Sequence, residues 1–150
     1  MEQNNHLIWA ERLCSRRELC PHDVRIKLKA RGVGDEEAER VVAALIQHNF
    51  LDEARYVRAF VHDKSHLQGW GPEKIRYALR AKEIPDSLVR EALAEIDQSA
   101  QRERLFRIIE SKRRNVKADS ENELREKLIR FALSRGFRYE EVIAAVKGVV

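Results

Sequence analysis

The stretch GWGPEKIRYALRAKEI, Gly69–Ile84, places two glycines and a proline around a tryptophan, ahead of a charged run with a narrow apolar stripe. Proline is tolerated at the first position of a helix, so Pro72 predicts a helix start with Gly71 as the N-cap. Trp70 before the cap and Ile75 in the fourth helical position fit a hydrophobic staple. We therefore interpret Trp70 as a packing residue at the entry to a helix.

The spacing of apolar residues in this stretch recurs twice elsewhere in the chain. The three sets are Trp70, Ile75, Leu79 and Ile84; Leu19, Val24, Leu28 and Val33; and Leu124, Ile129, Leu133 and Phe137. The last step of the third set is one residue shorter than in the other two, which is one mismatch. Gly32 and Gly136 precede the final apolar residue, where glycine commonly ends a helix, whereas Glu83 occupies that place in the middle set.

Each copy of this pattern has a candidate helix before it and another after it. The helices expected before the copies cover residues 6–17, 52–67 and 101–114, and those after them cover 34–50, 85–96 and 138–150. The apolar faces expected on the later helices are Ala38, Val41, Val42 and Leu45; Leu88, Ala92, Leu93 and Ile96; and Val142, Ala145, Val146 and Val149. Asp52 is a candidate N-cap, and Ser120 with Glu123 is a candidate capping box.

Three helices per copy predict an all-α chain of three tandem three-helix repeats. The expected units cover residues 1–50, 51–98 and 99–150. Repeats of this period pack mainly on their neighbours, so we expect an elongated, curved array that offers a long surface to a partner.

The composition favours a helical protein of the cytoplasm. Charged residues make up 36% of the chain and aromatic residues only 7%. The apolar runs are far too short to span a membrane, and the first residues do not form the pattern of a signal peptide. Two cysteines, Cys14 and Cys20, fit reduced thiols better than a disulfide framework.

The excess positive charge lies in the last third of the chain. Residues 99–150 carry 13 Lys and Arg against 8 Asp and Glu, and the segment 102–117 alone holds seven basic residues and two acidic ones. Such a cluster indicates a surface for polyanions or acidic partners. The alternative is a solvated helix face, because Lys and Arg are good helix formers.

The motifs of catalysis and metal binding are incomplete. His62 and His66 share one helix face four residues apart, but no third ligand is evident. Cys14, Cys20 and His22 would need a fourth ligand from elsewhere. The glycines before Pro72 lack the Lys-Ser/Thr of a phosphate-binding loop. We therefore expect no enzyme activity, no cofactor and no metal site.

The segment Leu51–Ile84 resembles the central motif of the RecX regulatory proteins. The matching residues are Leu51, Asp52, Arg55, Tyr56, Phe60, Val61, Gly69, Gly71, Pro72, Ile75, Leu79, Lys82 and Ile84. The segment Leu13–Val33 resembles the N-terminal part of that family, and the match is looser after Ile84. Departures from the family pattern are Val57, His62, Asp63, Glu83 and Cys20.

The resemblance implies a regulator of the RecA recombinase without catalytic activity of its own. Such proteins bind RecA and its filament on single-stranded DNA and restrain ATP hydrolysis, strand exchange and cleavage of the SOS repressor. The candidate contacts to the partner or to DNA are Arg55, Arg76, Arg80, Lys82, Arg102, Arg104, Arg107, Lys112, Arg113 and Arg114. The candidate structural residues are Leu51, Asp52, Tyr56, Phe60, Gly69, Trp70, Gly71, Pro72, Ile75, Leu79 and Ile84.

Two other functions stay open at this stage. The chain could bind DNA directly and independently of RecA, since three-helix units can place a helix in a groove of DNA. It could also be a helical scaffold that binds neither. The sequence further favours a monomer that binds DNA only weakly when RecA is absent.

Overall fold

The computed structural model describes residues 2–150, and side chains from residue 5 onward. This part of the chain is helical and contains no strand. Its elements are α1 (Glu2–Arg16), α2 (Pro21–Ala30), α3 (Asp35–Gln47), α4 (Glu53–His62), the π-helix η1 (Asp63–Leu67), α5 (Pro72–Ala81), α6 (Asp86–Ala94), α7 (Gln98–Arg113), α8 (Glu121–Ser134) and α9 (Tyr139–Val149). None of these helices is both long enough and apolar enough to cross a membrane.

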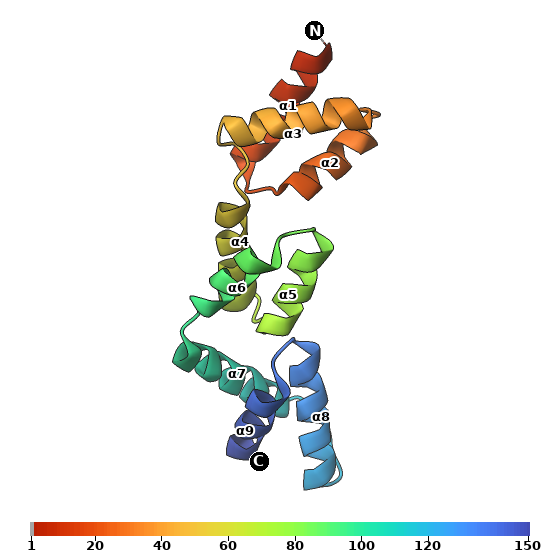
Figure 1. Ribbon diagram of the computed structural model, residues 1–150. Coiled ribbons are helices and arrows are strands. Elements are labelled where there is room, and N and C mark those ends of the chain that lie inside the picture. Colours follow the sequence, from red (N-terminus) through yellow and green to blue (C-terminus); the bar gives the residue numbers. More distant parts are fainter. Residues whose placement is uncertain (1) are drawn as a thin grey trace.

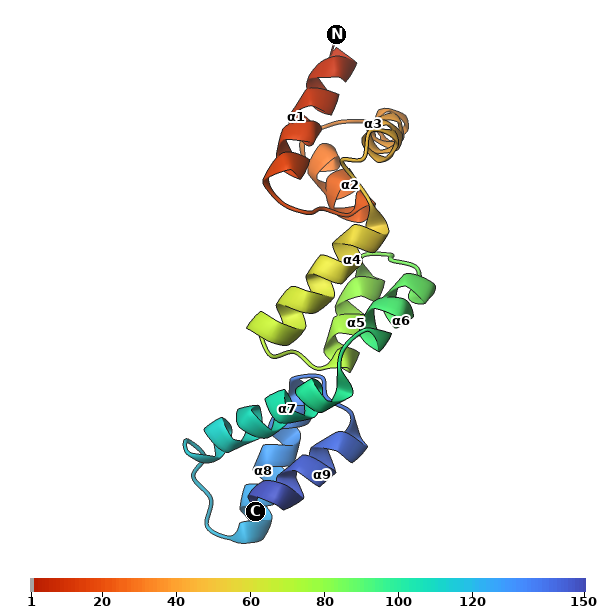
Figure 2. The ribbon, with the colours of Figure 1, turned by 90° about the vertical axis from the view of Figure 1, so that its left-hand side faces the viewer.

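The helices form three successive three-helix units, each around its own hydrophobic core. One core lies among α1, α2 and α3, a second among α4, α5 and α6, and a third among α7, α8 and α9. Every helix pair with extensive contact lies inside one unit. The units stack end to end into an elongated, curved body with the termini at opposite ends (Figures 1 and 2). The predicted fold class is confirmed, and the exact unit boundaries stay a prediction.

The predicted helix starts agree well with the structure. Pro72 is the first residue of α5 and Gly71 is its N-cap. Asp52 caps α4, because its carboxylate accepts a hydrogen bond from the backbone N–H of Arg55 at 3.0 Å. Ser120 caps α8 by accepting from the N–H of Glu123 at 3.1 Å. The return bond of the predicted capping box differs, since the Glu123 carboxylate accepts from Asp119 rather than from Ser120.

The predicted apolar faces are mostly buried. The residues expected on α3 are all in the core, and so are three of the four on α9. On α6 the buried residues are Val89, Ala92 and Leu93, whereas Leu88 and Ile96 are only partly buried. Helix α7 begins at Gln98, three residues earlier than expected, because the carboxylate of Asp97 accepts from the N–H of Ser99 at 2.9 Å.

The predicted register of the third repeat is wrong by one residue. Leu133 was expected in the core but is 40% exposed, and α8 buries Leu128 and Ala132 instead. Backbone bonds give the correct alignment: the N–H of Phe137 donates to the carbonyl of Ala132, as Ile84 donates to Leu79. With Leu128, Ala132 and Phe137 the last two steps equal those of the other repeats, and the first position of the pattern falls on Glu123 instead of an apolar residue. The small alanine was overlooked because leucine is the stronger apolar signal.

The helix expected to run to residue 67 changes character at His62. It continues as the π-helix η1, in which the buried Ser65 hydroxyl donates to the carbonyl of Val61 at 2.6 Å. Single π turns inside or beside α-helices are frequent at functional sites. Here the wider turn leads the chain into Gly69 and towards the third unit.

Candidate interaction surface

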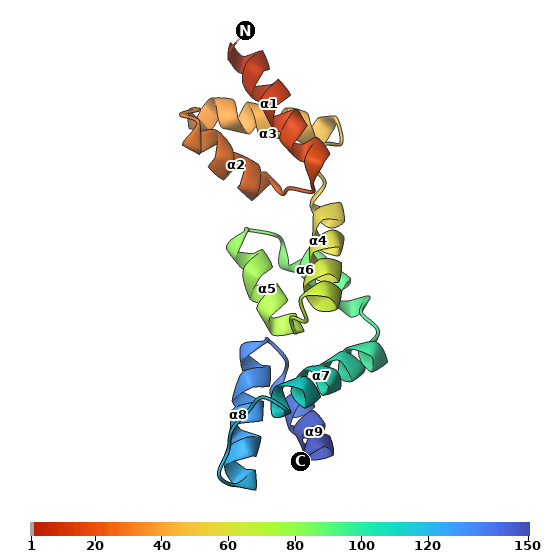
Figure 3. The same ribbon diagram turned by 180° about the vertical axis from the view of Figure 1, so that it is seen from behind.

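The second helices of the three units stand head to tail in one column. The C-terminal end of α8 meets the N-terminus of α5, and the C-terminal end of α5 meets the N-terminus of α2 (Figures 1 and 3). The head-to-tail order aligns the helix dipoles favourably, and at the junction of α8 with α5 the terminal carbonyl groups of one helix accept hydrogen bonds from terminal N–H groups of the other. This column sets how the three units are placed relative to one another.

The lower junction, between α8 and α5, is made by backbone atoms. The N–H of Gly71 donates to the carbonyl of Arg135 at 2.7 Å, and the N–H of Glu73 donates to the carbonyl of Gly136 at 2.9 Å. A Cβ at Gly71 would lie 2.4 Å from the carbonyl of Gly136, and a Cβ at Gly136 would lie 2.3 Å from the Cβ of Lys74. The glycine before Pro72 is therefore required by the neighbouring unit as well as by helix capping.

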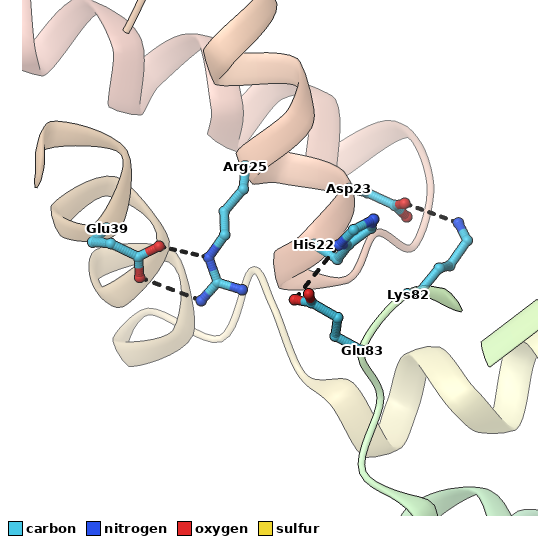
Figure 4. Close-up of polar contacts among 6 residues, drawn as sticks. All are labelled: His22, Asp23, Arg25, Glu39, Lys82 and Glu83. Atoms are coloured by element: carbon cyan, nitrogen blue, oxygen red, sulfur yellow. Dashed lines mark hydrogen bonds and ion pairs between the residues drawn. The ribbon is translucent and has the colours of Figure 1, made fainter. Parts of the chain in front are cut away.

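The upper junction, between α5 and α2, is made by side chains (Figure 4). The Lys82 ammonium lies 2.8 Å from the Asp23 carboxylate, and Glu83 lies 3.7 Å from His22. Glu83 has a φ of 60°, a conformation that strains a residue with a Cβ. It occupies the place that Gly32 and Gly136 fill in the other units, also with positive φ. On the far side of α2, Arg25 binds Glu39 of α3 at 2.6 Å.

The ionisation of the upper junction is shifted in favour of the ion pair. Burial opposes the charge on Lys82, but hydrogen bonds with Asp23 and Tyr56 prevail and raise its pKa to about 12. Burial likewise opposes the charge on Asp23, and Lys82 outweighs it, so the pKa of that carboxyl is lowered. Burial raises the pKa of the neighbouring Cys20 thiol to about 11, so this thiol is protonated at neutral pH.

Two of the predicted contact residues are bound within the chain. Lys82 forms the upper junction just described. The Nε of Arg55 lies 2.7 Å from Glu18 in the linker after α1, and its Nη2 donates to the backbone carbonyls of Asn49 and Phe50. Both cations therefore join the first unit to the second. Their contact with a partner stays a prediction.

The other predicted contacts on α5 lie at its surface. Arg80 faces Asp86 across an exposed ion pair of 3.6 Å. Arg76 is half-buried, and its Nε has no hydrogen-bond partner in the described part of the chain. Neither residue lines the hollows described below.

The structure divides the basic cluster of α7 between different sides of the helix. Only a thin stripe of this helix, Gln101, Leu105 and Ile109, is buried. Arg102 lies beside the exposed Phe106, while Arg113 and Arg114 are exposed at the C-terminal end. The remaining members, Arg104, Arg107 and Lys112, line one hollow.

This lower hollow lies between the π-helix of the second unit and helices α7 and α8 of the third. It has a volume of about 580 Å³, and its lining contains four cationic side chains and no carboxylate: Arg104, Arg107, Lys112 and Arg135. Burial and the charge of Arg107 lower the pKa of Arg104. Such mutual repulsion favours an anionic ligand. Arg135 is not among the predicted contact residues, although it occupies the same place in the third repeat as Lys82 does in the second.

A second, upper hollow of about 600 Å³ lies between the first and second units. Its lining joins the loop after α1, helix α2 and helix α4, and includes Ile26, Phe60 and Lys64. Gln68 lines this hollow and the lower one as well. We call the two hollows together the Gln68 groove.

The metal-binding alternatives find little support in the described residues. The rings of His62 and His66 stack at 4.4 Å, and the Nδ1 of His66 lies 2.9 Å from the Ser65 hydroxyl. Cys14 packs on the first core, whereas Cys20 is buried in the second. Across the described part of the chain, no three His, Cys, Asp or Glu residues gather as ligands for one ion.

The sequence matches known family models and relatives over most of its length. The model of the second three-helix domain of RecX matches residues 52–93, and that of the third matches residues 100–146. Regulatory protein RecX of Prosthecochloris aestuarii is 36% identical over 121 residues, which cover 81% of this chain and 78% of that protein. The chain belongs to the RecX family. It is therefore a member of a family of regulatory proteins.

Other RecX proteins differ in length from this chain. Regulatory protein RecX of Clostridium botulinum (strain Alaska E43) is 34% identical over 126 residues, 83% of this chain, but the chain spans only 58% of that relative. The crystal structure of RecX from Lactobacillus salivarius superposes with a TM-score of 0.84 at 19% identity, covering 98% of this chain and 96% of that one. At this identity the RecX structure supports the fold alone.

Proposed function

We propose that this RecX family chain binds RecA and the RecA filament on single-stranded DNA, and that it mainly inhibits RecA. The affected activities would be ATP hydrolysis, strand exchange and the co-protease activity of the SOS response. Membership of the RecX family carries this proposal. We further infer that the chain acts in the cytoplasm as a monomer and needs no cofactor.

The shape of the molecule is consistent with binding to a filament. Three units held by a stacked helix column give a long body that offers contacts to more than one subunit of a helical polymer. Several weak contacts on one body raise the affinity for the polymer over a free subunit, because later contacts form within the same complex. The proposed contacts are the exposed cations of α7, especially Arg102, Arg107 and Arg113, together with those of the lower hollow.

Direct DNA binding independent of RecA is the second candidate function. The observation that favours it is the lower hollow, where four cations meet without a carboxylate. A phosphate-dominated complex with single-stranded DNA loses about 0.7 log units of affinity per log unit of salt for each neutralised phosphate. The salt dependence of binding therefore separates direct DNA binding from binding to the RecA filament.

The test compares binding to bare single-stranded DNA with binding to RecA filaments assembled on the same DNA. Fluorescence anisotropy of the labelled chain would be measured at low and at near-physiological salt. The proposal expects tight filament binding that survives the higher salt, with weak binding to bare DNA. Equal affinity for both, lost in parallel as salt rises, would favour the direct DNA-binding function instead.

A further inference from the structure

The Gln68 groove carries exposed aliphatic side chains that no contact within the chain explains. Ile26 in the upper hollow is 55% exposed and Leu67, next to Gln68, is 76% exposed. Ile26 lies on α2 and Leu67 is the last residue of η1. Single exposed aliphatic side chains are common on protein surfaces, but beside a hollow they offer contacts to apolar groups of a partner.

The aromatic rings of the groove are less available than the aliphatic side chains. The ammonium of Lys64 lies 5.4 Å from the ring centre of Phe60, and that of Lys82 lies 5.5 Å from the ring centre of Tyr56. The ammonium of Lys112 covers Phe131 at 4.8 Å. Nucleic-acid bases bind single-strand proteins mainly by stacking on open aromatic faces. The groove therefore suits aliphatic side chains better than bases.

The charges of the groove favour an acidic ligand, weakly in the upper hollow and strongly in the lower one. In the upper hollow, Glu18 is bound by Arg55 and Asp23 is bound by Lys82, which neutralises both carboxylates. Within the described residues, the Asp63 carboxylate has one ion-pair partner, His62, at 3.6 Å. Arg17 and Lys27 also line this hollow, and within the described residues neither forms an ion pair. The lower hollow adds its four cations.

We propose that the Gln68 groove binds an extended acidic segment of polypeptide that carries aliphatic side chains. Its aliphatic residues contact Ile26 and Leu67, and its carboxylates pair with Arg107 and the other cations of the lower hollow. The exposed amide of Gln68 can donate to and accept from the extended backbone of the segment. Resting on the proposed function, we assign this segment to RecA rather than to the DNA of the filament.

Site-specific crosslinking tests which molecule occupies the groove. A photoreactive amino acid is placed at Leu67 or Ile26 of the full chain, and at Tyr77 as the control. Tyr77 is 78% exposed and lines neither hollow. With RecA filaments present, Leu67 and Ile26 should crosslink to a RecA peptide rich in Asp and Glu. Crosslinks from Leu67 or Ile26 to the DNA, or crosslinks from Tyr77 alone, would overturn the inference.

Two substitutions give an independent readout in the binding assay. Leu67→Glu and Arg107→Glu each place a carboxylate in the groove at an exposed position, so the melting temperature should not change. Each should weaken filament binding about tenfold. Tyr77→Glu adds the same charge as Leu67→Glu, but outside the groove, and should leave binding within about twofold.

The outcomes separate this inference from the function on which it rests. If the unchanged chain does not bind RecA filaments, the proposed function fails. If the chain binds normally and Leu67→Glu binds equally well, the proposed function stands and the groove is not the binding surface.

Discussion

Gly71 and Gly136 lie against each other at the junction of the second and third units, where a Cβ on Gly71 would come within 2.4 Å of the Gly136 carbonyl. Two backbone hydrogen bonds join the same helix ends. The tryptophan between two glycines is explained by this contact: Trp70 packs on the core of its own unit, whereas Gly71 admits the end of α8.

Substitution of Gly136 by alanine should destabilise the third unit. Alanine there would adopt a strained positive φ and also clash with Lys74, for a combined loss of about 3 kcal/mol in the free energy of unfolding. Gly32→Ala is the matched control, since Gly32 has a φ of 82° but open space around its Cβ position. It should lose only about 1 kcal/mol. Equal losses of stability for Gly136→Ala and Gly32→Ala in chemical denaturation would contradict a tight contact between α8 and α5.

Glu83→Gly should stabilise the protein by about 1 kcal/mol, because glycine adopts the positive φ of this position without strain. The lost contact with His22 is an exposed pair at 3.7 Å and contributes little. Glu83→Ala serves as the control, since it removes the carboxylate but keeps the strain. Only the glycine variant should unfold at a higher denaturant concentration than the unchanged chain.

Asp23→Asn should loosen the first unit from the second. The pair with Lys82 is 2.8 Å long and largely sheltered, so its loss should cost about 2 kcal/mol of stability. Glu39→Gln breaks the more exposed pair with Arg25 and should cost no more than about 0.5 kcal/mol. Urea unfolding of both variants measures the difference. A cost for Asp23→Asn no greater than that for Glu39→Gln would show that the junction does not depend on this pair.

The same pair predicts how stability depends on pH. The pKa of Asp23 is lowered on folding, so its contribution is present above about pH 4, the ordinary pKa of the carboxyl, and is lost as pH falls through the folded value. The pKa of Lys82 is raised to about 12, so its contribution is complete below about pH 10.5 and is lost as pH rises through 12. Between these limits the pair should add no pH dependence to the free energy of unfolding. The Asp23→Asn variant should lack the loss of stability that protonation of Asp23 causes at low pH.

Reversal of Arg102, Arg107 and Arg113 to glutamate should sharply reduce the inhibition of RecA while helicity stays unchanged. All three side chains are exposed on α7, so the change acts on the surface charge rather than on the core. The equally charged control reverses Arg12, Arg40 and Arg90, which are exposed on the other two units. Inhibition by both variants to the same extent would exclude α7 as the contact surface.

The fold could be predicted because its signals are local. Apolar spacing, Pro72 and the caps at Asp52 and Ser120 each specify a helix or its start within a few residues. The register of the third repeat failed where Ala132 takes a core position, since a small residue gives a weak apolar signal. The family motif includes Gly71 but does not show why glycine is required there. The reason is a backbone contact with a different unit.

The candidate interaction surface was harder to predict, because it depends on contacts between units. Composition located the positive charge in α7 but could not show that Arg104, Arg107 and Lys112 share a hollow with Arg135, the C-cap of α8. Arg55 and Lys82 are also predicted contact residues; both pair with carboxylates of the first unit, and their contact with a partner stays a prediction. An ion pair between distant segments leaves no pattern in a single sequence.

The most direct test of the central claim is the rate of ATP hydrolysis by RecA on single-stranded DNA as this chain is titrated in. A binder of the filament predicts a fall in rate at amounts well below one chain per RecA, at both low and near-physiological salt. A fall only when the chain is abundant enough to coat the DNA, or no fall with the RecA of the same organism, would contradict regulation through the filament.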